Sequence, residues 1–406
     1  MAVGSGILPE LHPVAGVRLG VASAGIKKPG RLDLVVMDIA AGSAVAAVFT
    51  KNAFCAAPVQ LAKQHLAAAA PRYLLVNTGN ANAGTGAQGL ERAGATCDRL
   101  AELAGVSRAE VLPFSTGVIG EPLPVDKITA ALPDALADLR ADGWLRAAQG
   151  IMTTDTRPKA ASVQLELDGK RVSITGISKG AGMIKPNMAT MLGYVATDAN
   201  VNGALLQRCI ERAVNRSFNR ITIDGDTSTN DACVLVATGA AGNAPIDGEQ
   251  HPSFAAFYAA LEQVFVELAH AIIRDGEGAT KFVAVEVAGG SDEAECVQVA
   301  YTVAESPLVK TALFASDPNW GRILAAIGRA GLADLDVSRI SVTINGVLIA
   351  ENGGRSPHYT EQQGIEAMAP EEITIAIALG RGAAQATVWT TDLSHDYVTI
   401  NAEYRT

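Results

Sequence analysis

The sequence is poor in aromatic residues and in charge. Of its 406 residues, 5% are aromatic and 18% are charged; globular proteins usually carry ~25% charged residues. Hydrophobic residues reach 49%, so the core must consist mainly of Ala, Val, Ile and Leu. This composition argues against a disordered chain. The length indicates two or three domains, or one large α/β body with an appendage.

Clustered positive charge is also missing. The net charge is −10, and no Lys/Arg-rich run occurs, so we expect no nucleic-acid partner. The first residues contain no basic stretch followed by an apolar one, as a secretory signal would. No apolar run reaches the ~18 residues of a membrane span. We therefore expect a soluble, cytoplasmic protein that acts on small molecules and has no membrane partner.

Cysteine and histidine do not occur at metal-binding spacings. The five cysteines are far apart and never form C-x-x-C, and the six histidines are scattered. This pattern predicts free thiols in a reducing compartment and no metal site. The cysteines are Cys55, Cys97, Cys209, Cys233 and Cys296.

Hydrophobic patterning predicts a mixed α/β chain. The clearest helices are expected at residues 57–70, 88–104 and 254–273, and the clearest buried strands at 32–39, 73–77 and 111–114. Residues 282–287 and 295–299 alternate like the strands of a hairpin around Gly289 and Gly290, and a further strand is expected before residue 224. We expect a catalytic α/β domain over residues 1–285 and a smaller α+β domain over residues 286–406.

Four loops rich in Gly, Thr and Asn are the candidate binding segments. They cover residues 77–86, 115–120, 179–190 and 224–231, and most follow an apolar strand. Ligands of α/β proteins gather at such strand ends. No G-x-x-x-x-G-K-[ST] occurs, and no G-x-G-x-x-G has the required context, so nucleotide binding is not indicated.

Residues 179–193, KGAGMIKPNMATMLG, carry the most information. Pro186 blocks a continuing helix. A hydroxyl residue after a small residue in a glycine-rich run suits a self-cleaving nucleophile. If the Ala189–Thr190 bond breaks, the new amine of Thr190 can act as the general base for its own hydroxyl. The alternative is a substrate or phosphate loop with an incidental threonine.

Other loops offer weaker candidates. Thr116 and Gly117 could form an oxyanion hole or a strand-to-helix turn with a capping hydroxyl. Glu277, between two glycines, could bind a substrate ammonium or lie on a solvated turn. Lys179 and Lys185 could pair with a carboxylate or be surface lysines. Residues 401–406 are expected to be frayed, as chain ends usually are.

Six motifs in order resemble one family. They are NTGNANAGTG, STGVIGEP, KGAGMIKPNMATMLG, TIDGDTSTND, RDGEGATKF and the terminal NAEYRT. From about residue 10 to the last residue, the chain resembles the ornithine acetyltransferases of arginine biosynthesis, also called bifunctional glutamate N-acetyltransferases.

The resemblance implies a layered α/β sandwich of the N-terminal-nucleophile type, similar to certain self-processing aminopeptidases. It implies self-cleavage between Ala189 and Thr190 into an α chain, 1–189, and a β chain, 190–406, which assemble as a heterotetramer (α2β2). The C-terminal tail is expected to return to the active site. No metal or organic cofactor is expected.

The resemblance also assigns site residues. Thr190 matches the nucleophile, and Thr116 and Gly117 match the oxyanion hole. The matching substrate contacts are Thr153, Lys179, Thr190, Glu277, Asn401 and Thr406, with Thr154 as the alternative to Thr153. The implied reaction moves an acetyl group from N2-acetylornithine to glutamate through an acetyl-threonine.

Two questions stay open at this point. The motifs do not tell whether acetyl-CoA is a second donor. A self-processing amidase or aminopeptidase of similar fold, or a metabolite-binding protein without activity, are the alternative functions.

Overall fold

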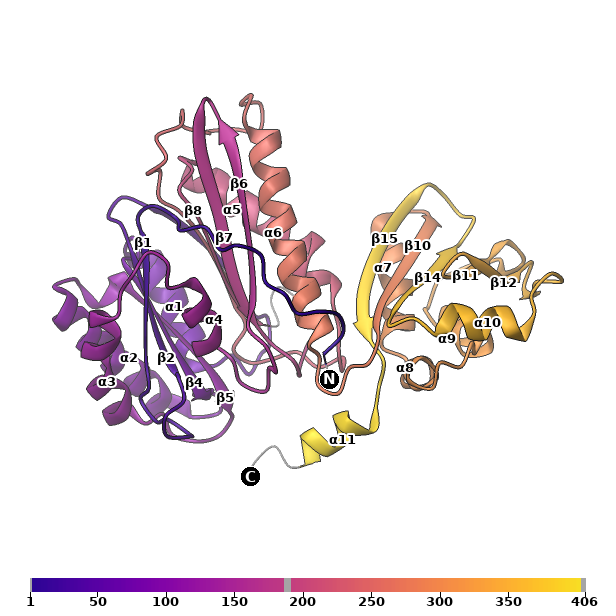
Figure 1. Ribbon diagram of the computed structural model, residues 1–406, viewed down its shortest axis with the longest axis horizontal. Helices are drawn as coiled ribbons and strands as arrows, with labels where there is room; N and C mark the ends of the chain where they lie inside the picture. The colour runs from indigo at the N-terminus through magenta and orange to yellow at the C-terminus, as the bar shows by residue number, and fades with distance from the viewer. Residues whose placement is uncertain (1, 186–190, 403–406) are drawn as a thin grey trace.

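The chain folds into three β-sheets with helices packed against them (Figure 1). The computed structural model describes residues 2–185 and 191–402. The first sheet has the strand order β1-β2-β4-β5, the second β3-β9-β8-β7-β6, and the third β13-β12-β11-β14-β10-β15.

The first two sheets are buried on both faces. In the first sheet only β4 and β5 are parallel, and in the second only β8 and β9 are parallel. Every residue of β2, β8 and β9 is buried, which explains why these strands are almost entirely apolar, with Asp38 in β2 and Thr197 in β8 as the exceptions. The strands are β1 (Val17–Ala22), β2 (Leu34–Ile39), β3 (Ala44–Phe49), β4 (Tyr73–Asn80), β5 (Val111–Val118), β6 (Lys159–Leu167), β7 (Lys170–Lys179), β8 (Leu192–Thr197) and β9 (Ala232–Ala237).

The two sheets face each other and form the middle of a four-layer sandwich. Aliphatic side chains of both sheets share one core, and α4 (Trp144–Gly150) packs into its side. The outer layers are α2 (Gly86–Ala104) and α3 (Val125–Ala137) on the first sheet, and α5 (Gly203–Arg216) and α6 (Phe254–Arg274) on the second. α1 (Ala57–Ala68) packs beside α2 and β5. This arrangement is the layered α/β sandwich expected from the sequence, and the prediction is confirmed.

Helix α6 is long and apolar enough, by length and composition alone, to cross a membrane. It packs along β6 and β7, and ten of its 21 residues are buried in the core, with apolar positions at helical spacing. Its position is that of a core helix of the sandwich.

The third sheet has its own aliphatic core and its own helices. β10 pairs in parallel with β14 and antiparallel with β15. The expected domain division after residue 285 falls inside β10, and the two-domain assignment stays a prediction. The elements are β10 (Phe282–Gly290), α7 (Glu293–Ala304), α8 (Pro307–Phe314), α9 (Trp320–Gly328), β11 (Ser341–Ile344), β12 (Val347–Glu351), β13 (Gly354–Arg355), α10 (Glu361–Met368), β14 (Glu372–Ala378) and β15 (Ala384–Thr391).

Two predicted strands are wrong. Residues 295–299 belong to α7, because Asp292 caps that helix by accepting from the Glu295 N–H, and Cys296, Val299 and Val303 then face the core at helical spacing. β10 pairs instead with two strands that are distant in the sequence, β14 and β15. The strand expected before residue 224 is reduced to a single bridge from Ile221 to Trp389.

The end of the chain is helical as far as it is described. Helix α11 (His395–Ala402) leaves the third sheet after β15 and runs back beneath the sandwich (Figure 1). Ser394 Oγ donates to the carbonyl of Gly278 at 2.6 Å, and Tyr397 Oη donates to Asp224 Oδ2 at 3.3 Å. The expectation of a frayed end is therefore wrong for residues 401–402.

Candidate functional site

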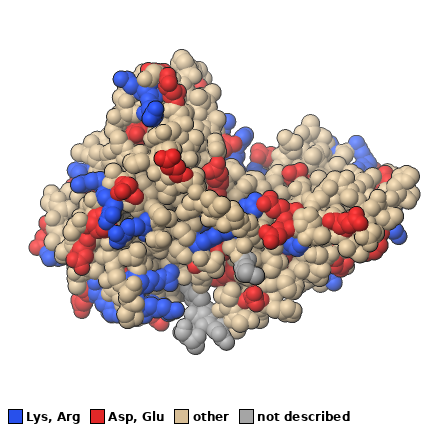
Figure 2. All heavy atoms as spheres, in the orientation of Figure 1, with Lys and Arg blue, Asp and Glu red and all other residues tan. Residues whose placement is uncertain are grey.

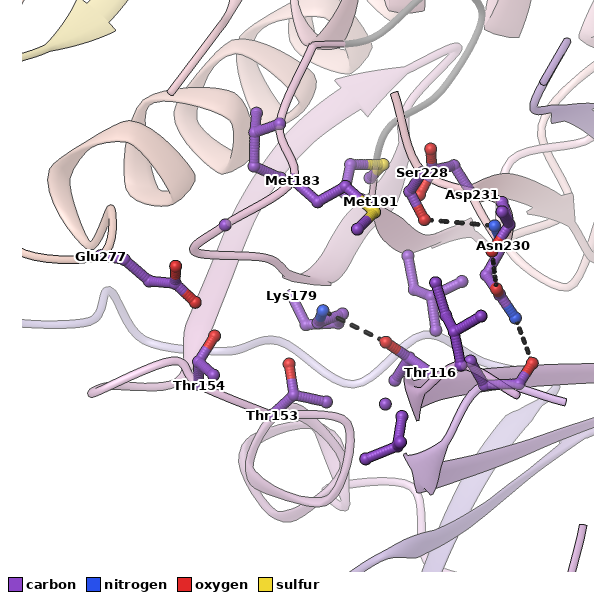
Figure 3. A pocket seen from close by; sticks show the side chains of 18 of the residues that line it. Thr116, Thr153, Thr154, Lys179, Met183, Met191, Ser228, Asn230, Asp231 and Glu277 are labelled. Carbon is purple, nitrogen blue, oxygen red and sulfur yellow. Dashed lines mark hydrogen bonds between the residues drawn. The ribbon is translucent and has the colours of Figure 1, made fainter. Parts of the chain in front are cut away.

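A cavity of about 280 Å³ opens where the ends of β5 and β7 meet the start of β8. Its walls come from segments far apart in the sequence (Figure 3). The sequence-predicted residues in its walls are Thr116, Gly117, Thr153, Thr154, Lys179, Glu277 and Asn401. Ala189, Thr190 and Thr406 lie outside the described residues. Met191, which follows Thr190 in the sequence, is in the cavity wall.

Thr116 and Gly117 lie near the end of β5, the edge strand of the first sheet. β5 continues through Val118, so the alternative of a strand-to-helix turn is wrong here. Gly117 has φ +136°, and a Cβ at this position would lie 2.3 Å from the carbonyl carbon of Gly79. Only glycine permits this close approach of β4 and β5. The Thr116 hydroxyl consequently points into the cavity.

Lys179 lies at the centre of the cavity, between Glu277 and Thr116 in Figure 3. Its Nζ donates to Thr116 Oγ1 at 3.3 Å. Burial lowers the pKa of Lys179, and the carboxylates of Asp155, Asp231 and Glu277 oppose that shift. Lys179 therefore places a largely buried amine in the wall of the cavity, next to the Thr116 hydroxyl, where it could meet a substrate carboxylate.

A buried ion triad fixes the segments that carry Thr153, Lys179 and Glu277. Lys159 Nζ donates to Asp155 Oδ1 and to Asp275 Oδ2, both at 2.6 Å, and all three side chains are at most 1% exposed. Burial alone would raise the pKa of Asp155, but the ammonium groups of Lys159 and Lys179 outweigh it and lower that pKa. Asp155 is therefore held as a carboxylate beside Lys159.

Asp155 connects two walls of the cavity directly. It accepts from the Thr153 N–H at 2.8 Å and from the Gly180 N–H at 2.7 Å. Asp275 meanwhile lies two residues before Glu277. One carboxylate–lysine–carboxylate chain thus positions the Thr153 turn, the end of β7 and the Glu277 turn relative to each other.

Glu277 is held in place rather than solvated. It is 8% exposed, its N–H donates to the Ala181 carbonyl at 2.8 Å, and its Oε2 accepts from Asn401 Nδ2 at 2.8 Å. The alternative of a solvated turn is wrong. The contact also brings α11, from the far end of the chain, to the cavity.

Thr153 and Thr154 both line the cavity, so the structure leaves both as candidates for the substrate contact. In Figure 3 both lie on the same side of Lys179. Lys185, the other candidate carboxylate ligand, instead pairs with Glu305 at 2.8 Å.

Asn230 and Asp231, directly before β9, also line the cavity, although the sequence did not predict them as site residues. Asn230 Nδ2 donates to the carbonyls of Ala81 and Ser115, at 2.5 and 2.9 Å, and so connects the segment after β4 to strand β5. Asp231 is 3% exposed, and its Oδ2 has no hydrogen-bond partner among the described residues. Burial raises the pKa of Asp231 well above its usual range. The sequence predicts the loop at residues 224–231 as a binding segment, but its composition does not single out these two positions.

The described residues include no group of three or more His, Cys, Asp or Glu side chains arranged to hold a metal ion. All five cysteines are free thiols, and four of them are buried.

The fold and the cavity define a class: an α/β enzyme with a small, partly charged pocket at the junction of two stacked sheets. Comparison with known proteins gives the family. Residues 18–406 match the ArgJ family, and the chain belongs to it.

The relatives match along the whole length. The arginine biosynthesis bifunctional protein ArgJ of Pseudomonas syringae pv. tomato is 64% identical over 406 residues, with all of both chains covered. A crystal structure of the Bacillus halodurans protein of that name is 39% identical, covers 52% of this chain and 97% of its own, and superposes with a TM-score of 0.50. An ornithine acetyltransferase of Mycobacterium tuberculosis, solved with ornithine, is 34% identical, covers 44% of this chain and 94% of its own, and gives a TM-score of 0.39.

Proposed function

We propose that this protein is an acetyltransferase of arginine biosynthesis that moves the acetyl group of N2-acetylornithine to glutamate through an acetyl ester on Thr190. One observation carries the proposal. Six of the residues expected from the family resemblance (Thr116, Gly117, Thr153, Lys179, Glu277 and Asn401) line one cavity, together with Met191.

The nucleophile would arise by cleavage of the Ala189–Thr190 bond. The freed amine of Thr190 would take the proton of its own hydroxyl as the oxygen attacks the acetyl carbon. Thr116 Oγ1 and the Gly117 N–H would donate to the oxyanion, and removal of one such donor typically costs about 100- to 1000-fold in kcat.

The first product would leave by C–N bond cleavage. The amine of Thr190 would return the proton to the α-nitrogen of ornithine, and the acetyl group would remain as an ester. Glutamate would then enter, and its amine would attack the ester carbonyl. N-acetylglutamate would leave as the threonine hydroxyl regains its proton.

Substrate recognition would follow from the charges of the cavity walls. Lys179 would pair with the α-carboxylate of either amino acid. Glu277, held by Asn401, would favour the ornithine ammonium, and Thr153 or Thr154 would donate to the substrate. Thr406 would complete the contact set.

The assembly and compartment belong to the same proposal. We expect α and β chains from one precursor, joined as α2β2 in the cytoplasm. The Bacillus halodurans chain matches only about half of this chain while nearly all of its own length is covered, as a separate chain of a cleaved protein would. No resident metal or cofactor is proposed, and acetyl-CoA would act as a co-substrate.

The Thr190→Ala variant tests the central step. Purified protein should give two bands, residues 1–189 and 190–406, on a denaturing gel, and the variant should give one uncut chain. Mass spectrometry after incubation with N2-acetylornithine should find an acetyl group on the β-chain N-terminal residue. An active protein with an intact Ala189–Thr190 bond would overturn the proposal.

A self-processing amidase of similar fold predicts a different product. It would release acetate from N2-acetylornithine at the same rate with or without glutamate. We expect acetate release to be slow and ornithine formation to depend on glutamate.

A further inference from the structure

A second cavity lies directly beside the first. It measures about 200 Å³ and shares four wall residues with the first cavity: Gly117, Val118, Thr153 and Thr154. The two cavities therefore adjoin along the tip of β5 and the Thr153 turn. Helix α11 borders both, because Asn401 lines the first and Ile400 the second.

The second cavity is lined by positive charge in a chain whose net charge is −10. Lys27, Lys28 and Arg31 all come from the loop between β1 and β2. Figure 2 shows Lys and Arg side chains gathering at the lower left of the molecule, over the end of the first sheet. Among the described residues, the salt bridges involve neither Lys28 nor Arg31.

The loop that carries these charges is anchored. Asp33, 2% exposed, accepts from the N–H groups of Ala24 and Ile26 at 2.6 and 2.7 Å, so the one carboxylate in the wall is already engaged. Lys127 Nζ donates to the Gly25 carbonyl at 2.7 Å.

Arg31 connects the loop to the first cavity. Its Nη2 donates to the carbonyls of Met152 and Thr153 at 2.6 and 3.0 Å. The basic loop is thus fixed to the turn that forms part of both cavities.

We propose that this second cavity binds the phosphorylated part of a thioester acyl donor, acetyl-CoA, whose acetyl end reaches the first cavity between the β5 tip and the Thr153 turn. Phosphate groups are the anions that Lys and Arg clusters recognise best. The inference rests on the proposed function, because the acetyl group must arrive at Thr190.

The reaction balances without a further reactant. The Thr190 oxygen attacks the thioester carbonyl, a C–O bond forms and the C–S bond breaks. The hydroxyl proton passes through the Thr190 amine to the departing sulfur, and the products are the acetyl ester and the thiol. Glutamate then accepts the acetyl group as it does with the other donor.

Lys28 is the position for a test, because it is exposed and holds no backbone in place. Lys28→Glu should raise the KM for acetyl-CoA about 10-fold, and so shift the donor preference towards N2-acetylornithine by a similar factor. Lys170→Glu is the matched control. It is also an exposed lysine, at the end of the ten-residue strand β7 that lies roughly 30 Å along the strand from Lys179 in the first cavity. Lys170→Glu should leave the reaction with both donors unaffected.

A fragment of the donor sharpens the test. Adenosine 3′,5′-bisphosphate, which lacks the acetyl-bearing arm, should compete with acetyl-CoA and much less with N2-acetylornithine, and this inhibition should weaken as salt is raised. Equal effects of Lys28→Glu on both donors, or equal inhibition of both, would place the donor elsewhere. Transfer from N2-acetylornithine with none from acetyl-CoA would overturn this inference alone, whereas loss of both would overturn the proposed function.

Discussion

The two-sheet sandwich and the third sheet are built from the same kinds of element, yet they bury different side chains. The sandwich buries a lysine, several aspartates and a glutamate, and most of them surround the cavity or hold its walls. The third sheet has an aliphatic core, and the charged residues buried beside it include Lys281, Lys310 and Asp392. Burying charge is costly unless the charge is paired. We therefore infer that the charged residues of the sandwich are kept for the active site, whereas the third sheet mainly stabilises the fold.

The largest difference should come from replacing Lys159 of the sandwich and Lys310 of the third region. Lys159→Met leaves Asp155 and Asp275 without their shared cation, and should lower the free energy of unfolding by about 3–5 kcal/mol and abolish most activity. Lys310 donates to the hydroxyls of Thr390 and Thr391 at 3.0 and 3.2 Å, and burial lowers its pKa to about 8. Lys310→Met should therefore cost only about 1–2 kcal/mol.

Urea unfolding and glutamate acetylation of both variants measure the contrast. A second variant, Lys159→Met with Asp275→Asn, should recover part of the lost stability because one unpaired charge is removed. If Lys159→Met and Lys310→Met lose equal stability and equal activity, the proposed difference between the sandwich and the third region is wrong.

His270, at the contact between the two regions, should make the free energy of unfolding depend on pH in acid. His270 of α6 contacts the rings of Phe282 and Trp389, and burial lowers its pKa to about 4. An unfolded histidine titrates near ~6.5, so between these values the unfolded state binds the extra proton. Stability should fall as the pH drops through this window, by up to about 3 kcal/mol.

His270→Leu should flatten that acid dependence when the unfolding free energy is measured from pH 7 to pH 4. His358→Leu, at an exposed position of the third region, is the control and should keep the wild-type slope. An unchanged slope in His270→Leu would show that other groups cause the acid sensitivity.

Helix α11 follows the third sheet and reaches the first cavity, so a variant that displaces it tests whether this helix contributes to activity. Gly278 has φ +69°, and a Cβ there would lie 2.6 Å from both Ser394 Oγ and Tyr397 N. Gly278→Ala should displace α11, cost about 1–3 kcal/mol and lower kcat/KM for N2-acetylornithine.

Gly346→Ala is its matched control. Gly346 has φ +82° in the turn between β11 and β12, and a Cβ there would meet nothing within 4 Å. It should cost about 1 kcal/mol from backbone strain alone and leave activity unchanged. If both variants keep full activity, α11 does not contribute to the site.

Replacing Asp231 should cause the smallest change in the free energy of unfolding. Burial raises its pKa, so the folded state holds a proton that the unfolded chain releases near ~3.9. Stability therefore falls as the pH rises from that value through the folded pKa. Asp231→Asn keeps a neutral side chain and should remove this decline, raising the unfolding free energy at pH 7 by about 1 kcal/mol. A loss of stability instead would mean that the carboxylate is charged and paired.

Strong periodicity made much of the fold predictable. The expected helix at 254–273 corresponds to α6, and the apolar run at 32–39 contains β2. The strand predicted at residues 295–299 is wrong because the same apolar pattern also fits one face of a helix. The Asp292 cap, which favours the helix, lies three residues upstream.

The site was predictable only where motifs carried it. The resemblance named Thr116, Lys179 and Glu277, which the structure brings together. It gave no sign of Asp155 or Lys159, because ion pairs between distant segments leave no periodic pattern in the sequence. The sequence did not predict the basic loop at Lys27 as a binding segment, because two lysines and one arginine are too few to form a recognisable basic run.

Helix α11 has a practical consequence for anyone preparing this protein. Asn401, five residues before the last one, already forms part of a cavity wall. A purification tag fused after Thr406 would therefore begin within about 21 Å of Asn401, since six residues span no more than that when fully extended. The opposite terminus offers little more freedom, since Val3 is buried and its N–H donates to the Arg274 carbonyl at 2.7 Å. Assays should use protein from which any such extension has been removed.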